Sequence, residues 1–385
     1  MTMFGFSQPP IVRHALGAVA PAAKPSVQDV FVSRTLDAAQ PWEIVRIPAL
    51  CRTSTGTLLA FAEARQAVAD QSSNMIVLRR RLAGSSKWQP AQIVAHDAPA
   101  SLNNPCVLVV HDRILLMYQR YPQGTTERTA ATGPVSAQTC RTLLQSSSDD
   151  GVTWSAPRDI TSAVRSPESR SDACGPGIGI QLQHGPHAGR LLFPFNEGVG
   201  GRWRVFAVYS DDGGSVWQRG ETAPTAPAML PNETQFAERS DGSVLINSRD
   251  QGGSHTRLVG ISKDGGETWS PLQKSPGLPD PECMASLLRF SFHPDLLVFC
   301  NPADPVHRRN GTIRLSHDGG GTWQMIRVVA PRSFGYSCMC VLPRSRVGLL
   351  YEVAERSGAG SAGYRIVYTT VPITVPRRSP KQPDN

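Results

Sequence analysis

Short apolar runs recur along most of the chain, and turn-forming residues separate them. Several alternate apolar and polar positions, the period of a strand with one buried face, and others are continuously apolar over five or six residues. The runs are too short for buried helices and contain many β-branched and aromatic residues. They lie at 57–65, 74–81, 106–110, 114–118, 190–195, 204–210, 243–249, 296–300, 311–316 and 346–353. The pattern predicts an all-β protein with many short strands.

One polar pattern repeats between these runs, Ser-x-Asp-x-Gly-x-(Thr/Val)-Trp. Full copies end at Trp154, Trp217, Trp269 and Trp323, and a decayed copy, RLAGSSKW, ends at Trp88. Successive tryptophans are 66, 63, 52 and 54 residues apart. Asp and Gly favour a tight hairpin turn, and we expect the Trp to pack back between neighbouring units. Turns of this kind are called Asp boxes.

A repeat of this length in an all-β chain is typical of propeller blades. Five turns over about 290 residues leave room for six four-stranded antiparallel blades, so we predict a six-bladed β-propeller with Asp-box turns. The segment 364–373, YRIVYTTVPI, is placed to close the ring beside the first strands. We expect an extended N-terminal segment at 1–28, a propeller at 29–375 and a basic tail at 376–385.

The charge composition of the chain indicates which kind of ligand it binds. The 385 residues carry a net charge of +8, and only five of the 39 basic residues are lysine. Arginine contacts carboxylates and phosphates with two parallel bonds, so this bias suits an anionic ligand. Basic clusters interleaved with aromatics are lacking, and we therefore expect no nucleic-acid partner.

Other sequence features bear on membrane insertion, compartment, disulfides and metal binding. No run of 18 apolar residues occurs, so no membrane-spanning helix is expected. The N-terminus has no cationic start and only a short apolar stretch, LGAVA, which argues against a signal peptide and favours the cytoplasm. The eight cysteines lie mostly in apolar runs without a CxxC motif, which favours buried thiols and leaves disulfides open. His184 and His187 have metal-like spacing but lie in a Gly/Pro loop without further ligand residues.

A second set of motifs resembles the sialidase family, in family order, over roughly residues 30–375. They are VRIP at 45–48, LLAFAEAR at 58–65, Asp70 before NMIVLRR, NNPC at 103–106, NETQFAERSDGSVLINSRD at 232–250, NPADPVHRRNGTIRLS at 301–316 and FGYSCMCVLP with GLLYE at 334–352. Val45 replaces the usual aromatic of the first motif, and Asp70 lies in ADQSSN, where Gly or Glu more often follows the Asp.

The resemblance implies an exo-α-sialidase, a glycoside hydrolase that removes terminal sialic acids from glycans. A sialic acid carries a carboxylate on its anomeric carbon, and the family binds it with an arginine triad, here Arg46, Arg249 and Arg308. Glu352 matches the residue that orients the first arginine, and Arg65 and Asn104 match further sugar contacts. Arg308 is preferred to Arg309 because it stands three residues before Gly311.

The resemblance also implies the catalytic groups. Sialidases use a tyrosine nucleophile, the role matched here by Tyr336, with Glu233 as its base and Asp70 as the acid that protonates the leaving oxygen. Glu233 is preferred to Glu238 because it lies sixteen residues before Arg249. All three groups are side chains, so no cofactor or metal is implied.

Two other interpretations stay open at this point. A hydrolase that prefers the deaminated sialic acid KDN would show the same triad, which contacts only the shared carboxylate. A propeller that binds sialoglycans without catalysis would lack Tyr336 or Asp70, and both are present. Sialylated glycans are the expected partners, and the sequence carries no signal for an oligomeric state.

Overall fold

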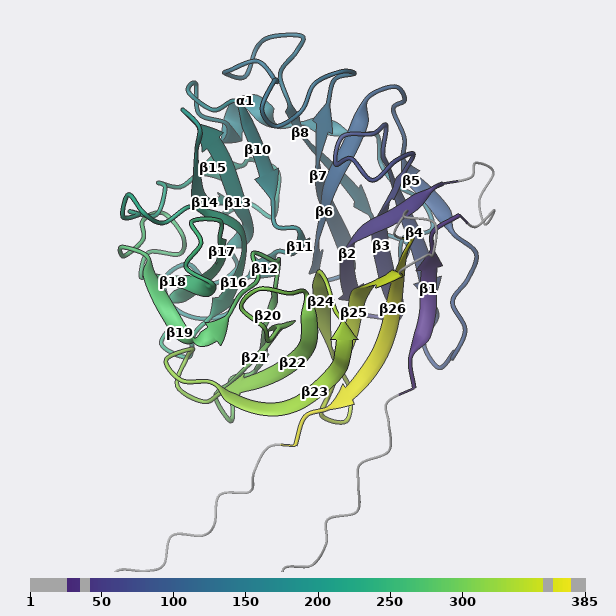
Figure 1. Ribbon diagram of the computed structural model, residues 1–385, viewed down its shortest axis with the longest axis vertical. Helices are drawn as coiled ribbons and strands as arrows, with labels where there is room; N and C mark the ends of the chain where they lie inside the picture. Colours follow the sequence, from purple (N-terminus) through teal and green to yellow (C-terminus); the bar gives the residue numbers. More distant parts are fainter. Residues whose placement is uncertain (1–25, 35–41, 356–362, 375–385) are drawn as a thin grey trace, which may run out of the picture.

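The protein, described here from a computed structural model, is a six-bladed β-propeller, as the sequence predicts (Figure 1). The structure describes residues 26–34, 42–355 and 363–374. Most of the expected N-terminal segment and the whole tail at 376–385 lie outside these residues. In the described part of the chain, no helix is long and apolar enough to span a bilayer.

Four of the six sheets are plain four-stranded antiparallel blades. The first blade contains β2 (Ile44–Arg52), β3 (Leu58–Arg65), β4 (Met75–Arg81) and β5 (Gln92–Ala95), and the fourth contains β16 (Pro231–Glu238), β17 (Val244–Asp250), β18 (Thr256–Ser262) and β19 (Gln273–Pro279). The fifth blade contains β20 (Ser286–Ser291), β21 (Leu296–Pro302), β22 (Arg309–Ser316) and β23 (Gln324–Ser333). The sixth contains β24 (Ser337–Leu342), β25 (Arg346–Glu355), β26 (Gly363–Pro372) and β1 (Gln28–Val32).

The second and third blades each carry one additional short strand. The second contains β6 (Ser101–Val110), β7 (Arg113–Tyr121), β8 (Arg141–Ser147) and β9 (Arg158–Asp159), with β11 (Gly177–Ile178) parallel to β6. The third contains β10 (Ser171–Cys174), β13 (Leu191–Val199), β14 (Arg202–Ser210) and β15 (Gln218–Arg219), with β12 (Ile180–Gln181) beside β13. A single helical turn, α1 (Thr161–Val164), precedes β10.

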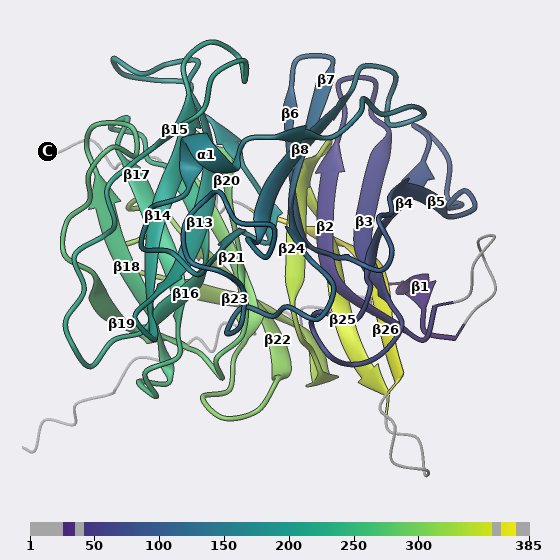
Figure 2. The same cartoon turned by 90° about the horizontal axis from the view of Figure 1, so that it is seen from above.

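The last blade closes the ring with both ends of the described chain. Strand β1 pairs antiparallel with β26, and Phe31 lies opposite Ile366. Strand β24 of this blade contacts β2 of the first, and Figure 2 shows the two blades side by side. The expected role of segment 364–373 in closing the ring is therefore confirmed.

The hydrophobic core is divided among the six interfaces between adjacent blades. Along β3, Ala60 and Ala62 face the sixth blade, whereas Leu59 and Phe61 face the second. Alternate side chains of a strand point to opposite faces of its sheet, so a strand between two neighbours buries both sets. This is why the sequence shows continuous apolar runs beside alternating ones.

The Asp-box tryptophans lie in these interfaces, as predicted. Each packs in the cluster between its own blade and the preceding one, usually against an aromatic ring: Trp154 against Phe61 and Trp269 against Phe236, with ring centroids 5.8 and 5.1 Å apart. The box therefore joins blades while it turns the chain.

Hydrogen bonds within the box explain its sequence. In the copy that ends at Trp154, the Ser147 hydroxyl donates to Asp149 at 2.8 Å and accepts the Gly151 N–H at 3.0 Å. Asp149 also accepts the Thr153 N–H at 2.9 Å. The hydroxyl and N–H bonds from Thr153 lower the pKa of Asp149 to about 2.

The eight cysteines are buried free thiols, which agrees with their apolar surroundings in the sequence.

We expect Asp149→Asn to destabilise the protein near neutral pH and less so in acid. The folded-state pKa of Asp149 lies below its usual 3.8, so the ionised group stabilises the fold fully above that value. This stabilisation is lost as the pH falls toward about 2, so the gap between wild type and variant should narrow. Urea unfolding near pH 6 and pH 3 measures the difference in unfolding free energy between wild type and variant.

Glu221→Gln is the matched control, because the exposed Glu221 makes no such turn bonds in the described structure. If Asp149→Asn lowers the free energy of unfolding equally at both pH values, the ionised Asp149 does not stabilise the turn as described.

Candidate active site

Tyr336 lies directly before β24 and forms the centre of a buried polar cluster. Its hydroxyl donates to Oε1 of Glu233, in β16, at 2.6 Å. Nη1 of Arg249, in β17, donates to the Tyr336 hydroxyl at 2.9 Å and to Oε2 of Glu233 at 2.6 Å. Two residues of the fourth blade thus hold the phenol oxygen of Tyr336 between a carboxylate and a guanidinium.

The two other predicted arginines lie over the ring of the same tyrosine. Cζ of Arg46, in β2, is 5.3 Å from the Tyr336 ring centroid, and Cζ of Arg308, directly before β22, is 5.2 Å from it. The structure thus brings the three predicted arginines, from three blades, to one side chain.

Glu352, in β25, fixes both Arg46 and Tyr336. Its Oε1 accepts Nε of Arg46 at 2.7 Å and the Ile47 N–H at 2.8 Å, and its Oε2 accepts the Tyr336 N–H at 3.2 Å. Burial opposes ionisation of Glu352, but Arg46 and these hydrogen bonds outweigh it and hold its pKa below the usual value. Ile47 has a left-handed φ of 59° at an irregularity in β2, which directs its N–H to this carboxylate.

The cluster carries an excess of positive charge. Glu352 pairs with Arg46, and Glu233 pairs with Arg249. Arg308 instead donates to the backbone carbonyl of Glu282 at 2.9 Å, and within the described residues no carboxylate forms an ion pair with it. Three guanidinium groups against two carboxylates suit a bound anion.

A second cluster lies on another wall of the site. Arg65 donates to Glu63 at 2.7 Å and to Asp70 at 2.8 Å. Glu63 also accepts the Asn104 N–H at 2.6 Å and an amide hydrogen of Asn74 at 3.2 Å. Asp70 lies in the loop between β3 and β4 with 69% of its side chain exposed, whereas Arg65 and Glu63 are buried. The exposed carboxylate is thus tied to a rigid blade through Arg65.

The two clusters face one cavity. Tyr336, Glu233, Arg65, Asp70 and Asn104 all line it. The sequence interpretation missed the other polar lining residues, which come mostly from the second and third blades: Gln71, Asn103, Gln119, Tyr121, Glu127, Asp172, Asn196, Trp203 and Asn232. Glu63 was also missed, although its position two residues before Arg65 on one strand places both on the same face of the sheet.

The two residues in each pair that was separated by spacing lie in different places. Arg309 points to Asp304, at 2.5 Å, while Arg308 lies over Tyr336. Glu238 accepts the N–H groups of Gln183 and His184 and lines a different cavity, while Glu233 contacts Tyr336. Val45, which replaces the family's aromatic, is fully buried between the first and sixth blades.

The phenol of Tyr336 is held in its neutral form. Burial, and then the charge of Glu233, raise its pKa well above the usual 10, although Arg249 and Arg308 oppose this. It therefore donates a hydrogen bond to a carboxylate placed to accept the proton. No group of three His, Cys, Asp or Glu side chains in the described structure is arranged to hold a metal ion.

The fold and site together define an Asp-box propeller in which three arginines surround a tyrosine at the edge of a polar cavity. Residues 56–349 match the model of the BNR repeat-like domain, and the chain belongs to this family.

Curated relatives of the chain are sialidases, which confirms the resemblance seen in the sequence. The chain is 35% identical to the sialidase of Micromonospora viridifaciens over 351 residues, with coverage of 86% of this chain and 53% of the relative. It is 32% identical to the sialidase of Bacteroides fragilis over 340 residues, with coverage of 80% and 59%. The chain thus spans little more than half the length of these two relatives.

Solved structures agree. The Hadza microbial sialidase Hz136 superposes with a TM-score of 0.74 at 27% identity, covering 86% of this chain and 66% of that one. The NanB sialidase of Streptococcus pneumoniae superposes with a TM-score of 0.76 at 15% identity, covering 90% and 70%, which supports the fold.

We expect Glu63→Ala to reduce the free energy of unfolding by about 3–5 kcal/mol, because it leaves the buried Arg65 without its principal partner. Chemical denaturation measures the loss. Glu267→Ala is the control, since Glu267 pairs with Arg190 at 2.9 Å but is 42% exposed, and it should cost about 1 kcal/mol or less. Equal losses in the two variants would show that Glu63 does not anchor this wall.

Proposed function

We propose that the protein is an exo-α-sialidase, which hydrolyses terminal α-ketosidically linked sialic acids of glycoproteins, glycolipids or oligosaccharides. The observation that carries the proposal is the convergence of Arg46, Arg249 and Arg308 on Tyr336, whose hydroxyl is bonded to Glu233. The sialidases among its relatives support the same substrate class.

The arginines bind the substrate carboxylate. Guanidinium groups from three directions bind this carboxylate and offset its charge, which places the anomeric carbon that carries it beside Tyr336. In this role Glu352 keeps Arg46 in place. Only Nε of Arg46 donates to Glu352, at 2.7 Å, so its other N–H groups are available to the ligand. Arg65 and Asn104 contact more distant parts of the sugar from the other wall of the cavity.

Tyr336 is the nucleophile. Its oxygen attacks the anomeric carbon, its proton passes to Glu233 across the 2.6 Å hydrogen bond, and the bond to the leaving oxygen breaks. A neutral phenol avoids the repulsion that an Asp or Glu would meet beside the substrate carboxylate. Arg249, 2.9 Å from the phenol oxygen, stabilises the negative charge that develops there.

Asp70 is the acid and then the base. It gives a proton to the leaving oxygen as the glycosyl–tyrosine bond forms, and it later takes a proton from the water that attacks the same carbon. Two displacements restore the original configuration, so the reaction retains it. The exposure of Asp70, on a loop at the rim, lets it reach a leaving group that extends toward solvent.

The test compares an aryl α-glycoside of N-acetylneuraminic acid with a natural sialyl-lactose. Wild type should hydrolyse both, and Asp70→Ala should lose about 10²–10⁴-fold on the natural glycoside but far less on the aryl one. A phenolate leaves without protonation, whereas a sugar alkoxide does not. Released sialic acid and kcat/KM give the result.

Ser72→Ala is the loop control, because Ser72 bonds within the same loop, to Asn74 at 2.9 Å, and carries no acid. It should affect both substrates alike. No turnover of either substrate by wild type would overturn the proposed function, and equal losses in Asp70→Ala would remove Asp70 from the acid role.

A further inference from the structure

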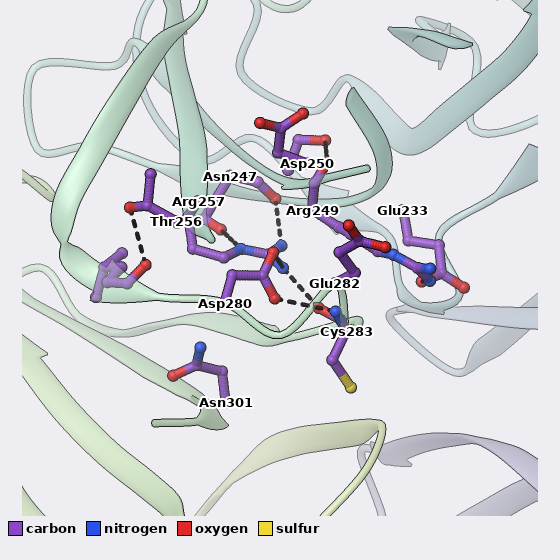
Figure 3. Close-up of polar contacts among 12 residues, drawn as sticks. Glu233, Asn247, Arg249, Asp250, Thr256, Arg257, Asp280, Glu282, Cys283 and Asn301 are labelled. Carbon is purple, nitrogen blue, oxygen red and sulfur yellow. Dashed lines mark hydrogen bonds and ion pairs between the residues drawn. The ribbon is translucent and has the colours of Figure 1, made fainter. Parts of the chain in front are cut away.

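Arg257, in β18, is a fully buried cation that the proposed reaction does not use. Its Nε donates to Oδ1 of Asn247 at 2.7 Å, and its Nη1 donates to Oδ2 of Asp280 at 3.2 Å and to the Cys283 carbonyl at 2.7 Å. Figure 3 shows its guanidinium between Asn247 and the segment that contains Asp280 and Cys283. A guanidinium without solvent needs such partners, so its position is closely defined.

These bonds hold a tight turn at residues 280–283. The Asp280 N–H donates to the His255 carbonyl at 2.9 Å, and Oδ1 of Asp280 accepts the Cys283 N–H at 3.0 Å. Glu282, between them, has a φ of 53°, a conformation that a non-glycine residue adopts at some cost. Arg257 and Asp280 therefore fix the turn from both of its ends.

The 280–283 turn also contacts residues of the candidate active site. The carbonyl of the left-handed Glu282 accepts Nη2 of Arg308 at 2.9 Å. The next side chain, Cys283, is buried in a cluster with Ile47 and Tyr336. The direction of the Glu282 carbonyl thus sets where the guanidinium of Arg308 lies relative to the tyrosine ring.

Arg257 is anchored on its other side to the strand of a second site arginine. Its partner Asn247 lies two residues before Arg249 on β17, and the Asn247 carbonyl also accepts the Thr234 hydroxyl at 3.1 Å, next to Glu233. In Figure 3, Arg249 and Glu233 lie beside the Arg257 cluster. The turn that supports Arg308 is therefore fixed to the strands that carry the tyrosine's partners.

We infer that Arg257 and Asp280 are positioning residues, which hold the 280–283 turn so that Arg308 points at the substrate carboxylate. The inference rests on the proposed function. The pair is electrically neutral, and both side chains are buried, at 0% and 1% exposure. It thus orients Arg308 without neutralising it, whereas a carboxylate placed directly on Arg308 would compete with the ligand.

The test is a double-mutant cycle on the Kd of an unsaturated sialic acid analogue with a free carboxylate. Asp280→Asn keeps an oxygen for the Cys283 N–H but removes the charge opposite Arg257. We expect it to weaken binding about tenfold in the wild-type background and less than twofold in an Arg308→Gln background. Thermal melts confirm that each variant is folded at the assay temperature.

Asp211→Asn is the matched control, because Asp211 accepts two bonds from Arg190, at 2.7 and 2.8 Å, away from the described cavity. It should change the Kd less than twofold in both backgrounds. If Asp280→Asn does not fold, Asn247→Ser removes another partner of Arg257 and should show the same dependence on Arg308 with a smaller effect.

Two results would overturn the inference: a Kd unchanged by Asp280→Asn, or a loss of the same size in both backgrounds. If wild type neither binds the analogue nor hydrolyses sialosides, the proposed function fails and the inference falls with it. The wild-type arm alone therefore distinguishes the two failures.

Discussion

The carboxylate of Glu352 connects the last blade of the propeller to the first, and the site depends on that connection. It accepts Arg46 and the Ile47 N–H from β2 and the Tyr336 N–H from its own blade. The sixth blade combines strands from both ends of the described chain, so residues over 300 positions apart meet at this group only when the ring closes. The contacts of Glu352 with Arg46 and Ile47 therefore require the closed ring.

The arginines around that point have two kinds of partner. Arg65 and Arg257 are compensated by buried carboxylates, and each serves to fix neighbouring groups. Arg308 receives a backbone carbonyl, a weaker partner that leaves its charge uncompensated. Arg308 is exposed, so its uncompensated charge stays accessible and requires water or an anionic ligand to solvate it. The proposed substrate carboxylate meets that requirement.

The fold could be predicted because its signals are local. The Ser, Asp, Gly and Trp of each Asp box meet within eight residues, and the strand period follows from blades that bury both faces. Short strands such as β11, which pairs parallel with β6, have too little pattern to be seen. Apart from Asp70, in the loop between β3 and β4, each residue matched by motif lies on a strand or directly beside one. Glu127, Asp172 and Trp203 line the cavity through loop and blade packing, and Arg257 acts through a turn distant in sequence, so only the folded chain reveals them.

The central claim is that the oxygen of Tyr336 attacks the anomeric carbon, and the configuration of the first product tests it most directly. NMR of the anomer released from an aryl α-sialoside should show α-sialic acid first with wild type. Tyr336→Phe, which keeps the aromatic ring beside Arg46 and Arg308, should stay folded and lose turnover. Tyr336→Gly opens space for water, so any residual product should appear first as the β-anomer. A folded Tyr336→Phe that releases α-sialic acid at the wild-type rate would contradict the account, because another nucleophile would then be required.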